Sequence, residues 1–397
     1  MSRPTPLLPF LIPRLLALSL ALFAGFTAAE RSFGVLFVLV CFLTLAAVLV
    51  LAREAAGQWK AQRARTVASR LLLSVLSLAL VLTPLEWGVS KILSRMAGQD
   101  FVQRGYEDML MKKVEVPGAE KAYVWNGALH VLDAMGMRRT TPFPPRDPSV
   151  FRIAALGDSL TYGMGVAEED AWPAVLERRL AKRFQVEVLN LGVTGFQSGD
   201  LLQNLPWVLE QVRPDLLLYG VCLNDFLPSG MSQKHNGDYA LPLPDSVKNF
   251  FIQRSRFCLS LAGVYTQALI RLGLRTDFCD DILSGFPAWR TRFASDALEM
   301  NRLAMEAGLP PIAALVLEQC PGLDPRMERL AEDAERDLKQ AGMQVIPSRG
   351  YREKNKGRLL ACSPWEGHPN EEAHAIFAGE IYDVLSTLPS LEKYPER

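Results

Sequence analysis

A serine and a histidine far apart in the chain are the residues best suited to do chemistry together. Ser159 follows an apolar strand and a tight turn, in the run Gly157-Asp158-Ser159-Leu160, and stands where a helix begins. Gly157 permits the sharp turn, and the start of the helix directs backbone N–H groups and the positive end of its dipole at any oxyanion formed on the serine. The pattern is typical of a nucleophile, although an Asp-Ser pair is also an ordinary helix cap.

His368 is the candidate general base among the four histidines of the chain. A serine hydroxyl is a weak nucleophile at neutral pH, so a base within hydrogen-bond reach must take its proton. His368 lies in a polar loop that leads into an apolar helix, residues 373–388. His130 lies in a spacer-like region and His235 in a polar stretch. His374 lies on the helix after the loop and is interpreted as a core or supporting residue.

A third group usually holds the other ring nitrogen of such a base. Glu366, two residues before His368, is the first candidate for this acid. Asp158 is the second candidate, but it adjoins Ser159 and is better suited to brace the turn. The two alternatives stay open at the level of the sequence.

Two further segments offer hydrogen-bond donors at the ends of strands. The predicted strand 186–189 leads into a glycine-containing run that ends at Gly195, where backbone N–H groups can approach a substrate closely. The predicted strand 216–221 leads to Asn224 and Asp225. The amide of Asn224 is therefore expected at the carboxyl edge of a sheet, where ligands bind in open α/β folds.

Together these four blocks resemble the SGNH (GDSL) hydrolase family, in which Ser, Gly, Asn and His occur in this order. The resemblance covers about residues 150–390. It implies that Ser159 is the nucleophile and His368 its base, and that the Ser159 N–H forms an oxyanion hole with Gly195 and Asn224. It also implies acyl transfer without a metal or organic cofactor.

The chain departs from the family pattern at two positions. Cys222 stands where the third block usually has glycine, so we expect a bulkier side chain to narrow the substrate pocket. Trp365 stands where the last block usually has the catalytic aspartate, so the acid role passes to Glu366 or is lost. Some members of the family are described as working with a Ser-His pair alone. Asp158 and Asp225 are interpreted as supporting residues.

The elements that must position these residues form an alternating pattern. Apolar runs alternate with helical patterns after residue 151, which predicts βαβ units and a parallel sheet with helices on both faces. The resemblance makes this a flavodoxin-like three-layer α/β/α domain over residues 151–390. A long insertion at about residues 227–294 is either a lid or acyl-chain groove, or a set of helices packed on the domain.

Residues 1–90 form a predicted membrane region with about three transmembrane helices. The apolar stretches 9–29, 33–52 and 71–89 are each near the length that crosses a bilayer. The first of them is alternatively a cleavable signal peptide. Residues 91–150 are charged, aromatic and proline-rich, and they are interpreted as a stalk or linker with some strands.

The loop charges predict the orientation of these spans. Five arginine and lysine residues crowd the connection between the second and third stretches, which should stay in the cytoplasm: Arg53, Lys60, Arg63, Arg65 and Arg70. The protein is therefore expected to be multi-pass in the cytoplasmic (inner) membrane, with its catalytic domain periplasmic or otherwise extracytoplasmic. In that compartment Cys320 and Cys362 could form a disulfide that pins the His368 loop, the alternative being buried free thiols.

Composition narrows the partners. The net charge is zero with 22% charged residues, so no basic field indicates nucleic-acid binding, and no cysteine spacing indicates a metal. We expect a membrane-anchored serine esterase acting on an ester-bearing glycan, lipid or small molecule. The alternatives are an O-acetyltransferase that modifies an exported polysaccharide with a multi-span membrane partner, and an inactive glycan-binding or assembly protein.

Overall fold

The structure is a computed structural model of the 397-residue chain. It describes residues 144–231, 239–252, 255–317, 325–348, 360–363 and 366–395, parts of 112–138, and scattered positions between 66 and 92. Among these residues no helix is both long enough and apolar enough to cross a bilayer. The predicted spans 9–29 and 33–52, and most of 71–89, lie outside the described residues.

The chain divides into two compact units. One comprises Met1–Leu93, Gly105–Glu107 and Leu241–Val264, and the other comprises the remaining residues, including all the parallel strands. The predicted insertion is therefore shared, because α8 (Asp245–Ile252) and the first part of α9 (Arg256–Arg271) belong to the first unit.

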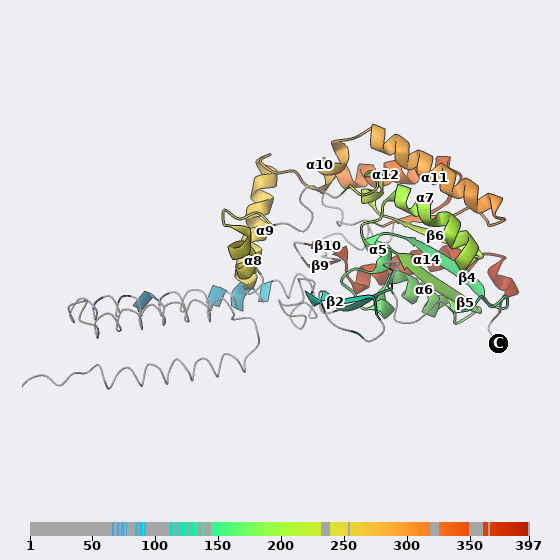
Figure 1. The fold of residues 1–397 in the computed structure, drawn as a ribbon, viewed down its shortest axis with the longest axis horizontal. Helices are drawn as coiled ribbons and strands as arrows, with labels where there is room; N and C mark the ends of the chain where they lie inside the picture. Colours follow the sequence, from blue (N-terminus) through green and yellow to red (C-terminus); the bar gives the residue numbers. More distant parts are fainter. Residues whose placement is uncertain are drawn as a thin grey trace, which may run out of the picture. The chain divides into compact units, whose positions relative to one another are not determined.

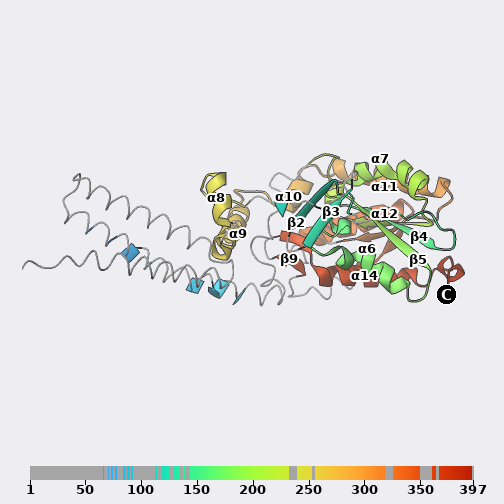
Figure 2. The same cartoon turned by 60° about the horizontal axis from the view of Figure 1, so that its bottom comes forward.

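A five-stranded parallel sheet forms the centre of the second unit (Figures 1 and 2). Its spatial order is β5-β4-β6-β7-β8, with every neighbouring pair parallel. The strand of this sheet that comes first along the chain, β4, thus lies between the second, β5, and the third, β6, which is the flavodoxin-like order. The strand bounds are β4 Phe151–Gly157, β5 Val186–Gly192, β6 Leu216–Val221, β7 Ala313–Val316 and β8 Gln344–Ile346.

Helices cover both faces of this sheet, as Figure 2 shows. Ile153 and Ala155 of β4 pack in one core cluster with the helices α6 (Trp172–Leu180) and α14 (Glu371–Leu385). Ala154 and Leu156 pack in the opposite cluster, with α7, α11 and α12. Successive strand residues point to opposite faces, so the predicted three-layer α/β/α architecture is confirmed. The bounds of these last helices are Ser198–Trp207, Ala288–Glu306 and Pro325–Gln340.

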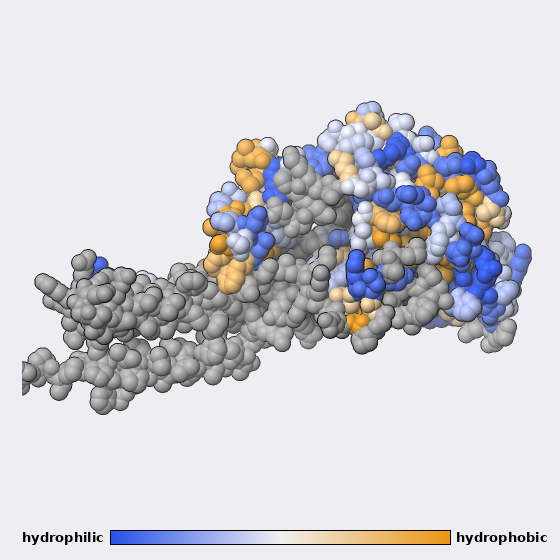
Figure 3. Space-filling view, in the orientation of Figure 1, coloured by the Kyte–Doolittle hydropathy of each residue, from blue (hydrophilic) through white to orange (hydrophobic). Residues whose placement is uncertain are grey.

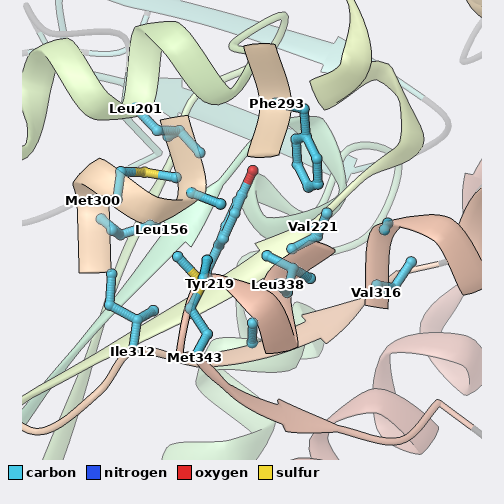
Figure 4. Close-up of a cluster of buried hydrophobic side chains, with 14 of the residues drawn as sticks. Leu156, Leu201, Tyr219, Val221, Phe293, Met300, Ile312, Val316, Leu338 and Met343 are labelled. Atoms are coloured by element: carbon cyan, nitrogen blue, oxygen red, sulfur yellow. The ribbon is translucent and has the colours of Figure 1, made fainter. Parts of the chain in front are cut away.

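The larger core cluster fills the space between the sheet and α7, α11 and α12 (Figure 4). Tyr219 of β6 and Phe293 of α11 lie in it at 1% and 0% exposure. Phe293 is followed by Ala297 and Met300, about one and two helical turns later and also buried, so one stripe of α11 faces the sheet. Burial of each large apolar side chain contributes about 1.5–3 kcal/mol.

The insertion contributes to this core as well. The short helix α10 (Phe278–Leu283) buries Cys279 and Ile282 there, and Phe286 and Trp289 pack against the same cluster. These residues therefore pack this part of the insertion onto the domain, in agreement with one of its two interpretations. By contrast, Figure 3 shows apolar side chains on the surface of α8 and α9, where the most exposed are Val247, Leu261 and Val264.

A small antiparallel sheet precedes the parallel one in the same compact unit. It consists of β1 (Lys112–Lys113), β2 (Lys121–Trp125) and β3 (Ala128–Leu132). Trp125 pairs with Ala128 across the dipeptide Asn126-Gly127, which is a strong signal for a tight hairpin. The sequence predicts some strands between residues 91 and 150, and these three strands lie there.

Candidate active site

The nucleophile turn has the predicted strand-turn-helix geometry. Strand β4 ends at Gly157, which has φ +154°, and a Cβ there would lie 2.2 Å from Thr161 Oγ1 and 2.6 Å from the Gly220 carbonyl oxygen. Asp158 then caps the short helix α5 (Ser159–Tyr162) by accepting a 2.9 Å hydrogen bond from the Leu160 N–H. Ser159 is thereby held at the start of the helix, at the carboxyl end of the sheet.

His368 lies beside this serine. It is part of β10 (Glu366–Pro369), which pairs with β9 (Ala361–Ser363) and leads into α14. His368 Nε2 is 2.9 Å from Ser159 Oγ, although the two residues are 209 positions apart. The fold therefore brings together the two residues that the sequence pairs as nucleophile and base.

The acid candidates occupy different places. Glu366 lies on the same strand as His368, but its side chain is outside the described residues, so its role stays a prediction. Asp158 Oδ2 is 3.3 Å from Ser159 Oγ, and the other oxygen, Oδ1, caps α5. Asp158 therefore braces the turn, as the sequence argument favours.

The loops that carry the oxyanion candidates adjoin the nucleophile turn. Gly195 lies after β5 with φ +84° and open space where a Cβ would project, and the Val193 N–H of the same loop donates to the Gly157 carbonyl at 3.1 Å. Asn224 lies on the short helix η5 (Leu223–Phe226), directly after β6. Its side chain lies near enough to Asp158 to help lower the pKa of that carboxyl. The oxyanion roles of both residues stay predictions.

Two fully buried carboxyl groups lie under the turn. Burial raises the pKa of Asp158, and hydrogen bonds from the Leu160 N–H and from the Asn224 side chain, with the charge of His368, partly lower it. Burial and then the charge of Asp158 raise the pKa of Asp225 well above its ordinary value. Asp225 also accepts a 3.0 Å hydrogen bond from the Cys222 N–H, which fixes η5. The supporting pair therefore shapes the turn that carries Asn224.

The expectation that Cys222 narrows the substrate pocket is wrong. Its side chain is fully buried and packs in the core cluster on the α6 and α14 face of the sheet. The alternation of residues along the end of β6 turns this side chain inward. Burial also raises the pKa of the thiol well above its ordinary value, so Cys222 is not a competing nucleophile.

The remaining predicted residues are either in the core or outside the described part. His374 is fully buried, accepts a 3.2 Å hydrogen bond from the Trp172 N–H at Nδ1, and has its pKa lowered to about 3 by burial. His374 is thus a neutral core residue. The predicted Cys320–Cys362 disulfide lies outside the described residues, because Cys320 is not among them. Within the described ranges no cluster of three or more His, Cys, Asp or Glu side chains could hold a metal ion.

Trp125, on the hairpin formed by β2 and β3, lies at the site and was not predicted from the sequence. Its indole ring packs against the His368 imidazole, with ring centroids 5.5 Å apart and an interplanar angle of 82°. The Asn126-Gly127 dipeptide between two apolar runs could have predicted the hairpin. Nothing in the sequence could have placed the hairpin beside a histidine 243 positions later.

Comparison with known proteins gives matches to esterases. A stretch of 77 residues is 38% identical to an arylesterase of Vibrio mimicus, and a stretch of 76 residues is 30% identical to the esterase TesA of Pseudomonas aeruginosa. Each stretch is 19% of this chain and 38% of the relative, so the match spans about two fifths of the length of these curated proteins.

Solved structures of similar proteins cover a larger share of the chain. A crystal structure of TesA is 17% identical, with a TM-score of 0.38, and covers 59% of this chain and 97% of its own. A catalytic mutant of an acetylxylan esterase from Geobacillus stearothermophilus is 13% identical, with a TM-score of 0.39, and covers 60% of this chain and 95% of its own.

The match to a family covers the whole site. The model of the GDSL-like lipase/acylhydrolase family matches residues 155–376, which is more than half of the 397-residue chain. This range includes both Ser159 and His368, together with the loops of Gly195 and Asn224. The chain therefore belongs to the GDSL-like lipase/acylhydrolase family.

Proposed function

We propose that this protein is a serine esterase that hydrolyses a carboxyl ester with Ser159 as nucleophile and His368 as general base. The observation that carries the proposal is the 2.9 Å contact between Ser159 Oγ and His368 Nε2. This distance allows direct proton transfer, and the serine stands at a helix start where developing negative charge is favoured. Family membership and the names of the two matched relatives, an arylesterase and an esterase, support the same reaction.

The reaction proceeds in two halves. Ser159 Oγ attacks the ester carbonyl carbon while His368 Nε2 takes the hydroxyl proton, and the tetrahedral intermediate collapses as the imidazolium gives that proton to the leaving alkoxide. The alcohol leaves and an acyl-enzyme remains. Water then attacks the acyl carbon, with His368 again accepting and returning the proton. The carboxylic acid leaves, and Ser159 regains its hydrogen.

The oxyanion of each intermediate needs hydrogen-bond donors. We assign these to the N–H groups of Ser159 and Gly195 and to the side-chain amide of Asn224. Because the Asn224 side chain lies close enough to Asp158 to help lower the pKa of that carboxyl, the amide lies beside the nucleophile turn, where its N–H groups are proposed to reach the oxyanion. Loss of one such donor typically slows an enzyme by about 10²–10³-fold.

The proposed substrate is an O-acyl or O-acetyl ester of a glycan or lipid, met on the outer side of the cytoplasmic membrane. The support for this location is the sequence of the N-terminal region, with three apolar stretches and a basic connection between the second and the third. A reporter enzyme that is active only outside the cytoplasm tests this location when joined after about residue 90. Activity of the reporter supports the orientation, and a silent reporter contradicts it.

The hydrolase test uses the full chain in detergent with p-nitrophenyl acetate, butyrate and longer esters. We expect turnover that falls by a factor on the order of 10³ or more in Ser159→Ala and in His368→Ala. Ser284→Ala is the matched control, since Ser284 caps the exposed end of α10 with a hydrogen bond to the Asp281 carbonyl and lies outside the site. Its turnover should equal that of the parent.

The outcomes separate the alternatives. A preference for acetate indicates a deacetylase, whereas a preference for long chains indicates a lipid ester. Turnover no higher than in Ser159→Ala contradicts the hydrolase proposal. In that case acyl transfer to an added glycan acceptor would favour the O-acetyltransferase, and no transfer would favour a binding protein.

A further inference from the structure

The N-terminal hairpin contacts both halves of the candidate active site. Trp125, the last residue of β2, packs edge-to-face with the His368 imidazole. Tyr123 of the same strand approaches Tyr162 of the nucleophile helix, with 3.1 Å between their hydroxyl oxygens. A segment that precedes the family-matched region thus reaches the base and the helix of the nucleophile.

The hairpin is fixed to the nucleophile segment by polar contacts. Arg138 is 2% exposed, and its guanidinium donates to the carbonyl oxygens of Gly163 and Val166, each at 2.8 Å, and to that of Leu129 on β3 at 3.0 Å. A buried guanidinium with three carbonyl acceptors is geometrically restrictive, because losing any one leaves a buried polar group unpaired. Arg138 therefore ties β3 to the segment that follows Ser159.

Aromatic stacking adds to this attachment. The His130 ring stacks on both Tyr123 and Tyr162, with centroids 5.0 and 5.5 Å away and interplanar angles of 13° and 12°. Burial lowers the pKa of His130 to about 3, so the ring is neutral and stacks without the cost of a buried charge. The hairpin is thus fixed against α5 by hydrogen bonds and stacked rings.

The Trp125 side chain has little room to move in its position on the hairpin. A Cβ at Gly165 would lie 2.5 Å from Trp125 Cζ3 and 2.7 Å from Cys362 Sγ, so the indole lies against the nucleophile segment at a point where that segment also approaches β9. Trp125 itself is only 9% exposed. A side chain packed this closely limits the rotation of the imidazole that it touches.

We propose that Trp125 is a positioning residue that holds the His368 imidazole in the orientation that keeps Nε2 within reach of Ser159 Oγ. This inference rests on the proposed esterase function. The 2.9 Å hydrogen bond between Ser159 Oγ and His368 Nε2 is lost when rotation of the imidazole moves Nε2 away from the serine. A displacement of about 1 Å can slow catalysis by about 10²-fold. The hairpin would then be a working part of the catalytic domain.

The test compares Trp125→Ala, Trp125→Leu and Trp125→Phe in the full chain with p-nitrophenyl acetate. We expect kcat to fall by about 30- to 100-fold in the Ala and Leu variants with KM changed less than about threefold, because the base is misplaced while the acetyl ester binds as before. Trp125→Phe keeps an aromatic edge and should retain kcat within about fivefold. The rate of Ser159 labelling by a small phosphonate should fall in parallel with kcat.

Leu129→Ala is the matched control, since Leu129 lies on the same hairpin but is 46% exposed. Thermal unfolding of each variant shows whether it is folded. If Trp125→Ala unfolds, the comparison of Trp125→Leu with Trp125→Phe at similar unfolding temperatures decides the matter. The inference is overturned if kcat of both Trp125→Leu and Trp125→Phe stays within about threefold of the parent, or if these variants differ from the parent only in KM.

The two proposals fail in distinguishable ways. A parent protein with no turnover above Ser159→Ala removes the esterase function, and the positioning role with it. An active parent whose Trp125 variants are equally active removes the positioning role alone.

Discussion

Gly192, the last residue of β5, packs directly against the backbone of the nucleophile helix. A Cβ at this position would lie 2.3 Å from the Tyr162 amide nitrogen and 2.8 Å from both the Thr161 carbonyl carbon and Tyr162 Cα. All three atoms belong to the main chain, so no side chain can rotate away. Gly192→Ala is therefore expected to push α5 away from the sheet.

The size of the shift follows from these distances. Ordinary van der Waals contact begins at 3.4 Å, so the helix must move by about 1 Å. Ser159 would move with it, and its hydrogen bond of 2.9 Å to His368 would lengthen beyond useful range. We expect kcat to fall by about 10²-fold, or about 2.7 kcal/mol in activation free energy, and stability to fall by about 1–3 kcal/mol.

The assay measures p-nitrophenyl acetate turnover and thermal unfolding side by side. Gly308→Ala is the control, since Gly308 follows α11 at φ +83° with open space where the Cβ would project. That variant should lose about 1 kcal/mol of stability through backbone strain while keeping its kcat. A folded Gly192→Ala protein with kcat within about threefold of the parent would contradict the expected displacement of α5.

Two further predictions concern the buried groups. Because the pKa of Asp225 is raised in the folded chain, its contribution favours the fold at low pH and is lost progressively as pH rises above 3.8 toward the folded value; Asp225→Asn should flatten this decline. Urea unfolding at about pH 5 and about pH 8 measures the change in the free energy of unfolding between the two pH values. An equal change in parent and variant would contradict the prediction. Trp172→Ala should destabilise by about 3–5 kcal/mol, because the indole is fully buried between the sheet and α14, and Trp172→Phe by less than half of that. A Trp172→Ala loss below about 1 kcal/mol would show that the cavity collapses.

The local geometry of the nucleophile could be predicted from neighbouring residues alone. Gly157, Asp158 and Ser159 are adjacent, so the turn and the cap depend on contacts within a few residues. The alternation of apolar runs and helical patterns likewise predicted a parallel sheet with helices on both faces, since each strand must bury both of its faces. The pairing of Ser159 with His368 came from comparing the four histidines and then from the family resemblance, and the structure places the two in contact.

The surroundings of the Ser159–His368 pair depend instead on how distant elements pack together. Cys222 turned into the core because the register of β6 fixes which face each side chain takes. Trp125 reached His368 because the hairpin docks on α5 through Arg138 and stacked rings, contacts between residues that share no sequence pattern. Local preferences act over one turn or one strand, whereas such contacts depend on how whole elements pack, and that is set by the complete chain.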